Sequence, residues 1–93
     1  MAFPRLPYKD PDAIVDYGVD WIRWLNDDTI VTSVWLPSVP SGITEDHSTN
    51  TPSAATIWLA SGTIGISYRL TNRIVTALGR TRDQTIVVPV RAL

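Results

Sequence analysis

Apolar and polar residues alternate most regularly between Ser67 and Val90, in two arms that meet at Leu78-Gly79. The apolar residues fall on even-numbered positions, at Tyr68, Leu70 and Ile74 in the first arm and at Ile86, Val88 and Val90 in the second. A period of two is that of a β-strand with one face on a core and the other in water. We therefore predict a long hairpin of two strands with a tight turn at Leu78-Gly79.

After the turn at Ser41-Gly42, Ile43–Ser48 is a candidate for a short edge strand. Thr29–Leu36 and Ala54–Ala60 predict strands, because each is short, rich in β-branched or other apolar residues, and bounded by turn residues. In the last segment Ala55, Ile57 and Leu59 fall on one face, so this face is expected to meet the core.

Ala13–Leu25 is ambiguous, since its apolar residues fit both helical and strand spacing. Gly18 would cost a helix about 1 kcal/mol, and Val and Trp are only moderate helix formers. β-branched and aromatic residues also suit a pleated surface. We interpret the segment as a strand with a bend near Arg23.

Together these elements predict an all-β fold, an immunoglobulin-like β-sandwich of about seven short strands separated by turn signals. Pro89 has no N–H to donate to a ladder, so it is expected on an edge strand or at a bulge. Residues 1–12 differ from the rest, because prolines at positions 4, 7 and 11 favour extended backbone. We expect an extended N-terminal arm, 1–12, followed by one sandwich domain, 13–93.

Apolar anchors are spaced along this arm at Phe3, Leu6 and Tyr8. The simpler interpretation is that the arm lies across its own domain. The alternative is that it reaches a neighbouring subunit, and the residues alone leave both open.

Composition narrows the classes of partner. The 93 residues carry a formal net charge of −1, which provides no basic field for nucleic acid and no polybasic patch for a membrane. The chain has no cysteine, which excludes disulfides and thiolate chemistry. The sequence shows neither a signal peptide nor an apolar run of about 20 residues that could span a membrane.

His47 is the only histidine, and it lies in the polar stretch EDHSTNT, which we expect to be an exposed loop. Its neighbours Asp46 and Ser48 do not make a triad, because a triad needs an imidazole held by a carboxylate against an activated hydroxyl. One histidine without cysteine is a poor zinc site, and the acidic residues follow no calcium-loop pattern. We predict no catalytic, cofactor-binding or metal-binding residue, no cofactor, and no enzymatic activity.

Four tryptophans are many for this length. Trp58 is out of phase with Ile57 and Leu59, so we expect it to point away from the core, and Trp35 is ambiguous in the same way. An outward tryptophan fits an interface anchor or a sugar-stacking platform. Arg69 and Arg73 are expected to share one face of the final hairpin, where they either protect an edge or meet an acidic partner.

The order of DYGVDW, DTIVTSVW, TIWLASG and the run S-Y-x-L-T-N-R-I-x-T with its G-R-T turn resembles the small bacteriophage virion proteins known as fibre–tail adaptors. The resemblance runs from about Lys9 to Val90. It departs from the family at Pro37–Ser41, which is longer than a plain turn and leaves the strand end near Leu36 open.

The resemblance implies an immunoglobulin-like sandwich with a structural role in a phage tail. Several copies, arranged in a ring, would dock tail fibres or spikes onto a tail tube, nozzle or connector, in a virion assembled in the host cytoplasm. It carries over no catalytic or binding residue. The alternatives are a carbohydrate-binding module that contacts host surface glycans and a small hydrolase. The candidate interface residues are Phe3, Leu6, Tyr8, Trp58, Arg69 and Arg73.

Overall fold

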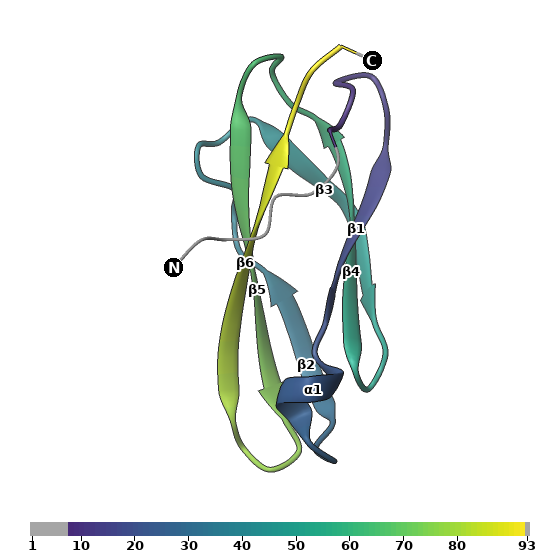
Figure 1. Ribbon diagram of the computed structural model, residues 1–93, viewed down its shortest axis with the longest axis vertical. Coiled ribbons are helices and arrows are strands. Elements are labelled where there is room, and N and C mark those ends of the chain that lie inside the picture. The colour runs from purple at the N-terminus through teal and green to yellow at the C-terminus, as the bar shows by residue number, and fades with distance from the viewer. Residues whose placement is uncertain (1–7, 93) are drawn as a thin grey trace.

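The computed structural model describes residues 8–92, which form two three-stranded antiparallel sheets packed face to face (Figure 1). The elements are β1 (Val15–Asp20), α1 (Ile22–Leu25), β2 (Ile30–Trp35), β3 (Ile43–Asn50), β4 (Ala54–Ser61), β5 (Ser67–Thr76) and β6 (Thr81–Pro89). One sheet has the order β1-β4-β3 and the other β2-β5-β6. The predicted all-β sandwich is confirmed, with six strands in the described residues where about seven were expected.

The alternating pattern places the core as predicted. On β4, Ala55, Ile57 and Leu59 are fully buried. The apolar positions of the final hairpin are buried as well, and Gly79 turns the chain with its N–H donated to the carbonyl of Thr76 at 2.9 Å. Pro89 is the last residue of β6, an edge strand, as its missing N–H requires.

The interpretation of Ala13–Leu25 as one bent strand is wrong in its second half, where the chain forms the short helix α1. Two local contacts explain the switch. The Asp20 carboxylate accepts the backbone N–H of Ile22 at 3.0 Å, and Asn26 ends the helix in the left-handed conformation at φ 48°. Polar side chains close to the backbone thus override the strand propensity at each end of a single turn.

The short edge strand predicted at Ile43–Ser48 is confirmed as part of β3, which extends from Ile43 to Asn50 at the edge of its sheet. The separate expectation of an exposed loop around His47 is wrong, because β3 pairs His47 with Trp58. The mainly polar sequence of β3 hides this strand, since most of its residues are exposed at a sheet edge. Beyond β2, pairing with β5 continues past Pro37: Val39 and Arg69 exchange two backbone hydrogen bonds of 2.9 and 3.0 Å.

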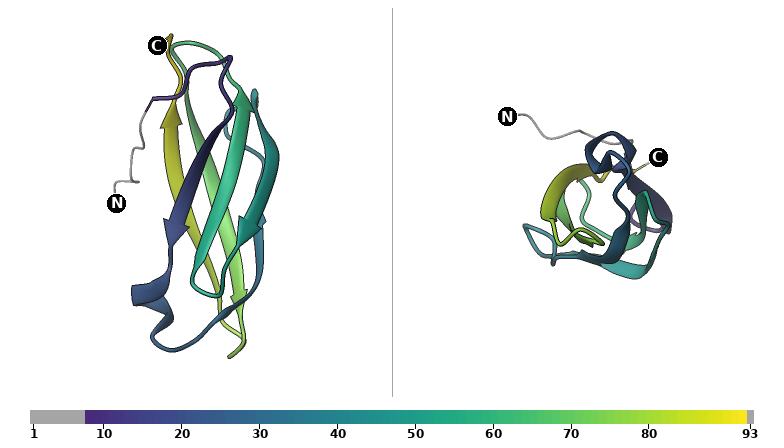
Figure 2. Two further views of the ribbon diagram at one scale, coloured as in Figure 1. Left: turned by 90° about the vertical axis from the view of Figure 1, so that its right-hand side faces the viewer. Right: turned by 90° about the horizontal axis from the view of Figure 1, so that it is seen from below.

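Two hydrophobic clusters fill the space between the sheets. The larger one includes Tyr17, Tyr68 and Val88, and the smaller one joins Trp21, Leu25, Ile30 and Ile74 around α1. Seen from below, α1 lies between β1 and β6 (Figure 2). Within residues 8–92, no helix has the length and apolar character needed to cross a membrane.

Phe3 and Leu6 lie outside the described residues. Lys9, which belongs to the predicted arm, is fully buried and pairs in parallel with Val90. Its Nζ donates to the carbonyl of Ser61 at 2.7 Å and to that of Asp10 at 2.8 Å. Burial lowers the pKa of Lys9, although Asp10 and Asp12 act in the opposite direction. The end of the predicted arm is therefore fastened to the top of the sandwich.

Candidate interaction surfaces

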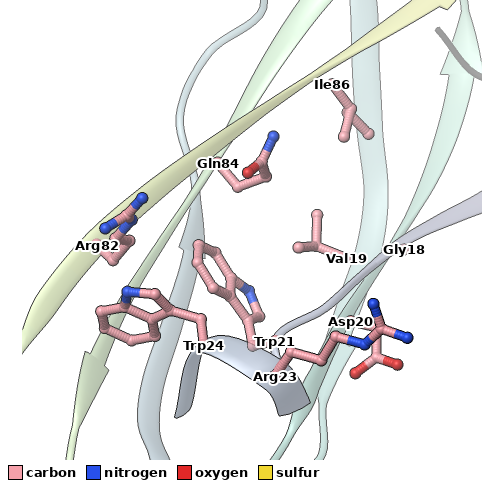
Figure 3. A pocket seen from close by; sticks show the side chains of 9 residues that line it. All are labelled: Gly18, Val19, Asp20, Trp21, Arg23, Trp24, Arg82, Gln84 and Ile86. Carbon is pink, nitrogen blue, oxygen red and sulfur yellow. The ribbon is translucent and has the colours of Figure 1, made fainter. Parts of the chain in front are cut away.

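A cavity of about 400 Å³ opens between β1 and β6, which are the edge strands of opposite sheets (Figure 3). We call it the β1/β6 groove. Its lining comes from the end of β1, from α1 and from the first half of β6: Gly18, Val19, Asp20, Trp21, Arg23, Trp24, Arg82, Gln84 and Ile86. The groove lies where β1 ends at Asp20 and the chain turns into α1 beside the first half of β6.

The floor of the groove is aromatic. The rings of Trp21 and Trp24 meet edge to face with centroids 5.6 Å apart. The guanidinium groups of Arg80 and Arg82 lie 4.2 and 5.5 Å from the centre of the Trp24 ring, in cation–π contact. The groove therefore offers an aromatic, apolar surface with a cationic rim, a combination that suits an apolar or aromatic side chain.

A buried polar network holds this floor in place. The indole N–H of Trp21 donates to Oδ1 of Asn72 at 2.9 Å. Nδ2 of Asn72 donates in turn to the hydroxyl of Ser33 at 2.9 Å and to the carbonyl of Val34 at 3.0 Å. Asn72 is fully buried in the core phase of β5, between Leu70 and Ile74. Its polar side chain interrupts the apolar alternation, and this was the one signal in the sequence for the network.

Asp28 and Arg80 brace α1 against the β5–β6 turn. The carboxylate accepts the backbone N–H of Thr29 at 2.8 Å and that of Leu78 at 3.2 Å, and Nε of Arg80 at 3.0 Å. Arg80 also donates to the carbonyl of Leu25 at 2.7 Å. Burial raises the pKa of Asp28, but hydrogen bonds from Thr76, Thr29, Arg80 and Leu78 outweigh it, so the pKa lies below its ordinary value of 3.8.

Trp58 lies on the outer face of the β1-β4-β3 sheet, as its phase predicted, but it is half-buried. The ring of His47 stacks on it with centroids 4.3 Å apart, and Nδ1 of His47 is 2.7 Å from a carboxylate oxygen of Asp46. All four tryptophans are buried or half-buried. Trp35 points inward against the larger core cluster. No exposed, coplanar tryptophan pair is present in residues 8–92.

Arg69 and Arg73 share the outer face of the β2-β5-β6 sheet, as predicted. They lie on the central strand, so they do not protect an edge. Arg73 makes a bidentate pair with Asp83, with N–O distances of 2.8 and 3.0 Å, and this hydrogen bonding lowers the pKa of Asp83. Val34 and Val39, 50% and 66% exposed, lie beside these arginines.

The two sheets differ in charge. The β1-β4-β3 sheet carries four carboxylates and no arginine or lysine, with Asp16, Asp20, Glu45 and Asp46 all exposed. The β2-β5-β6 sheet carries the three arginines Arg69, Arg73 and Arg82 against one carboxylate. The β1-β4-β3 sheet is thus acidic and the β2-β5-β6 sheet is basic, although Arg82 lines the β1/β6 groove and Arg73 is paired with Asp83.

The predicted interface residues that the structure describes do not share one surface. Trp58 is on the acidic sheet and the two arginines are on the basic one. Tyr8, 47% exposed, lies at the top of the sandwich under the guanidinium of Arg91, 4.6 Å from its ring centre. The β1/β6 groove was missed entirely, because the turn that creates it was interpreted as strand.

The described residues contain no group of three or more His, Cys, Asp or Glu side chains that could hold a metal ion. No curated protein matched the chain. Over residues 9–89 the chain matches the family model Gp77, described as the podophage GP4 fiber-tail adaptor protein gp77, and it therefore belongs to this family of structural phage tail adaptors.

Proposed function

We propose that this protein is a virion component that docks tail fibres or spikes onto the tail tube, nozzle or connector, with several copies in a ring. The family match over residues 9–89 carries the proposal. A family of structural adaptors argues against catalysis. The described residues also hold surfaces that could contact other proteins, namely two outer sheet faces and an aromatic groove.

The opposite charges of the two sheets support contacts between copies. An acidic face on one side and a basic face on the other let each copy bind the next in the same orientation. Such a heterologous contact forms a ring when its rotation closes. Complementary charge also speeds encounter and fixes the register of the contact. A ring of adaptors would present the same groove repeatedly around the tail axis.

The charged faces can be tested against each partner separately. Arg69→Glu reverses a charge on the basic sheet and Asp16→Lys reverses one on the acidic sheet. Affinities for copies of the chain, for the tube-side proteins and for the fibre are measured by titration at low and high salt. We expect each reversal to weaken one contact at least tenfold at low salt, and less at high salt, where charges are screened.

The control is Asp12→Lys, which makes the same charge change as Asp16→Lys at an exposed residue outside both sheets. It should leave every affinity within about twofold of the original chain, as rim charges far from a contact do. Equal losses of affinity in all three variants would contradict a specific role of the sheet faces in binding. Failure of the original chain to bind any tail protein would contradict the adaptor function itself.

A further inference from the structure

We propose that the edge of β6 beside the β1/β6 groove binds an extended segment of a partner protein as an added strand. The segment carries an aromatic or large apolar residue, which enters the groove, next to a carboxylate, which meets the cationic rim. This inference deepens the adaptor function and rests on it for the source of the segment, a tail protein that the chain binds. Three features of the described residues carry it: the backbone of β6, the floor of the groove and the charge at its rim.

Odd-numbered residues of β6 turn their backbone groups away from β5. Arg69 exchanges two backbone hydrogen bonds with Val39 on the β2 side of β5. Val87 lies opposite Arg69 in the antiparallel register, so the N–H and C=O of Val87 also face away from β5. Thr85 repeats this phase. Among residues 8–92, the N–H groups of Thr85 and Val87 have no hydrogen-bond partner, and the C=O of Thr85 accepts only the side chain of Gln84 at 3.0 Å.

The same edge already pairs with another segment at its upper end. The N–H of Lys9 donates to the carbonyl of Pro89 at 2.9 Å, and the carbonyl of Lys9 accepts the N–H of Arg91 at 3.0 Å. The edge of β6 is therefore open and straight enough to accept a strand. In strand addition of this kind the main chain provides affinity, and pockets for alternate side chains provide specificity.

The groove is the pocket for such a side chain. Gln84 and Ile86, the even-numbered residues on either side of Thr85, line the cavity of about 400 Å³ together with Trp24 (Figure 3). Alternate residues of an added strand face the same side as these two. One of them would enter the cavity above the aromatic floor, where an aromatic ring gains from edge-to-face or offset contact.

Charge at the rim selects the residue next to this anchor. The lining carries Arg23 and Arg82 against one carboxylate, Asp20. Arg82 is exposed and has no ion-pair partner within residues 8–92, and its contact with the Trp24 ring holds it beside the cavity. A carboxylate within one or two residues of the anchor would complement this guanidinium, whereas a lysine or arginine there would be repelled.

A proline at residue 85 tests the backbone contact. Thr85→Pro removes an N–H that the β5–β6 ladder does not use, and Pro89 already occupies the same phase of this strand. The control is Thr85→Val, which loses the same hydroxyl, 2.8 Å from that of Thr71, but keeps the N–H. The affinities of both variants for the fibre or spike protein and for the tube-side tail protein are measured by titration.

We expect Thr85→Pro to weaken binding to one of these partners at least about tenfold, as loss of a buried hydrogen bond does. Thr85→Val should stay within about twofold of the natural chain. The amide of Ile86, which faces β5, should remain protected from exchange in both variants and so shows that the ladder is intact.

A second pair of variants tests the rim. Arg82→Glu should weaken binding to the same partner at least about tenfold at low salt, whereas Arg82→Lys, which keeps the charge, should lose less than about threefold. Overlapping nine-residue synthetic peptides of that partner then locate the segment. The peptide that competes with the whole partner should contain an aromatic or large apolar residue within two positions of a carboxylate.

The outcomes separate this inference from the adaptor function. If Thr85→Pro, with Ile86 still protected, and Arg82→Glu bind both partners as the natural chain does, the inference is overturned and the adaptor function stands. If the natural chain binds neither partner, the adaptor function itself fails. If the natural chain alone is an oligomer by light scattering and Thr85→Pro is a monomer, the edge belongs to a second copy, which also overturns the inference.

Discussion

Asn72 connects three elements through one side-chain amide, joining Trp21 before α1, Ser33 on β2, and β5, to which it belongs. Trp35 provides the contrast, because its buried Nε1 has no hydrogen-bond partner in the part of the chain that the structure describes. The two indoles therefore differ in polar contacts while both pack against a core cluster.

This contrast makes a matched pair of variants. Trp21→Phe and Trp35→Phe remove similar volumes, but only Trp21→Phe leaves a buried acceptor, Oδ1 of Asn72, without its donor. An unsatisfied buried group costs about 1–3 kcal/mol. In urea unfolding, Trp21→Phe should lower the free energy of unfolding by at least about 1 kcal/mol more than Trp35→Phe. An equal or larger loss for Trp35→Phe would contradict the importance of the network.

Asp28 gives the fold a defined dependence on pH. Its folded pKa lies below 3.8, so its carboxylate contributes stability that is fully present above the unfolded pKa and lost as the pH falls through the folded value. We expect Asp28→Asn to be less stable than the natural chain at pH 7. The difference between the two urea midpoints should shrink steadily below about pH 4.

The control for this measurement is Asp27→Asn, because Asp27 is the exposed neighbour of Asp28. Its urea midpoint at pH 7 should stay close to that of the natural chain. If the difference in urea midpoint between Asp28→Asn and the natural chain stays constant from pH 7 to pH 2, the ionised carboxylate is not what stabilises α1.

At the scale of elements, periodicity predicted the strands whose two faces differ in polarity. β4, β5 and β6 have an apolar inner face and were found with their inward residues correctly assigned. The length of β3 was underestimated because its residues are mainly polar, and its pairing with β4 is what makes it a strand. α1 was missed because four residues are too few to show a helical period, and side-chain contacts from Asp20 define its start.

Two turn glycines adopt positive φ angles that an L side chain rarely adopts. Gly79, at φ 83° in the β5–β6 turn, has open space where a Cβ would be. Gly62, at φ 103° after β4, would place a Cβ 2.9 Å from Cγ2 of Val90. Gly79→Ala should cost about 1–2 kcal/mol of unfolding free energy from backbone conformation alone. Gly62→Ala should cost more, since Val90 must also move.

Urea unfolding of the two variants, analysed with the same dependence of unfolding free energy on urea concentration, shows which variant loses more stability. A smaller loss for Gly62→Ala than for Gly79→Ala would mean that the loop after β4 relaxes freely. That result would also weaken the view that the top of the sandwich, where Lys9 and Val90 meet, is firmly packed.

At the scale of the whole molecule, the sequence predicted the fold class and the family but not the surfaces. Trp58 and the arginine pair were placed outside the core correctly, yet sequence phase cannot say which sheet a strand joins, so their separation onto opposite faces was not foreseen. The groove depends on where β1 stops relative to β6, which local patterns do not encode. The charge difference between the sheets likewise appears only once the strands are sorted into their sheets.

The central claim is that this protein connects two other parts of a phage tail. The most direct test is the mass, by light scattering after gel filtration, of a mixture of the fibre or spike protein with the tube-side tail protein, with and without this chain. The account predicts one complex containing all three proteins when the chain is present, and two separate species when it is absent. If the fibre and the tail protein associate equally well without the chain, or if the chain stays a monomer apart from both, the adaptor account is contradicted.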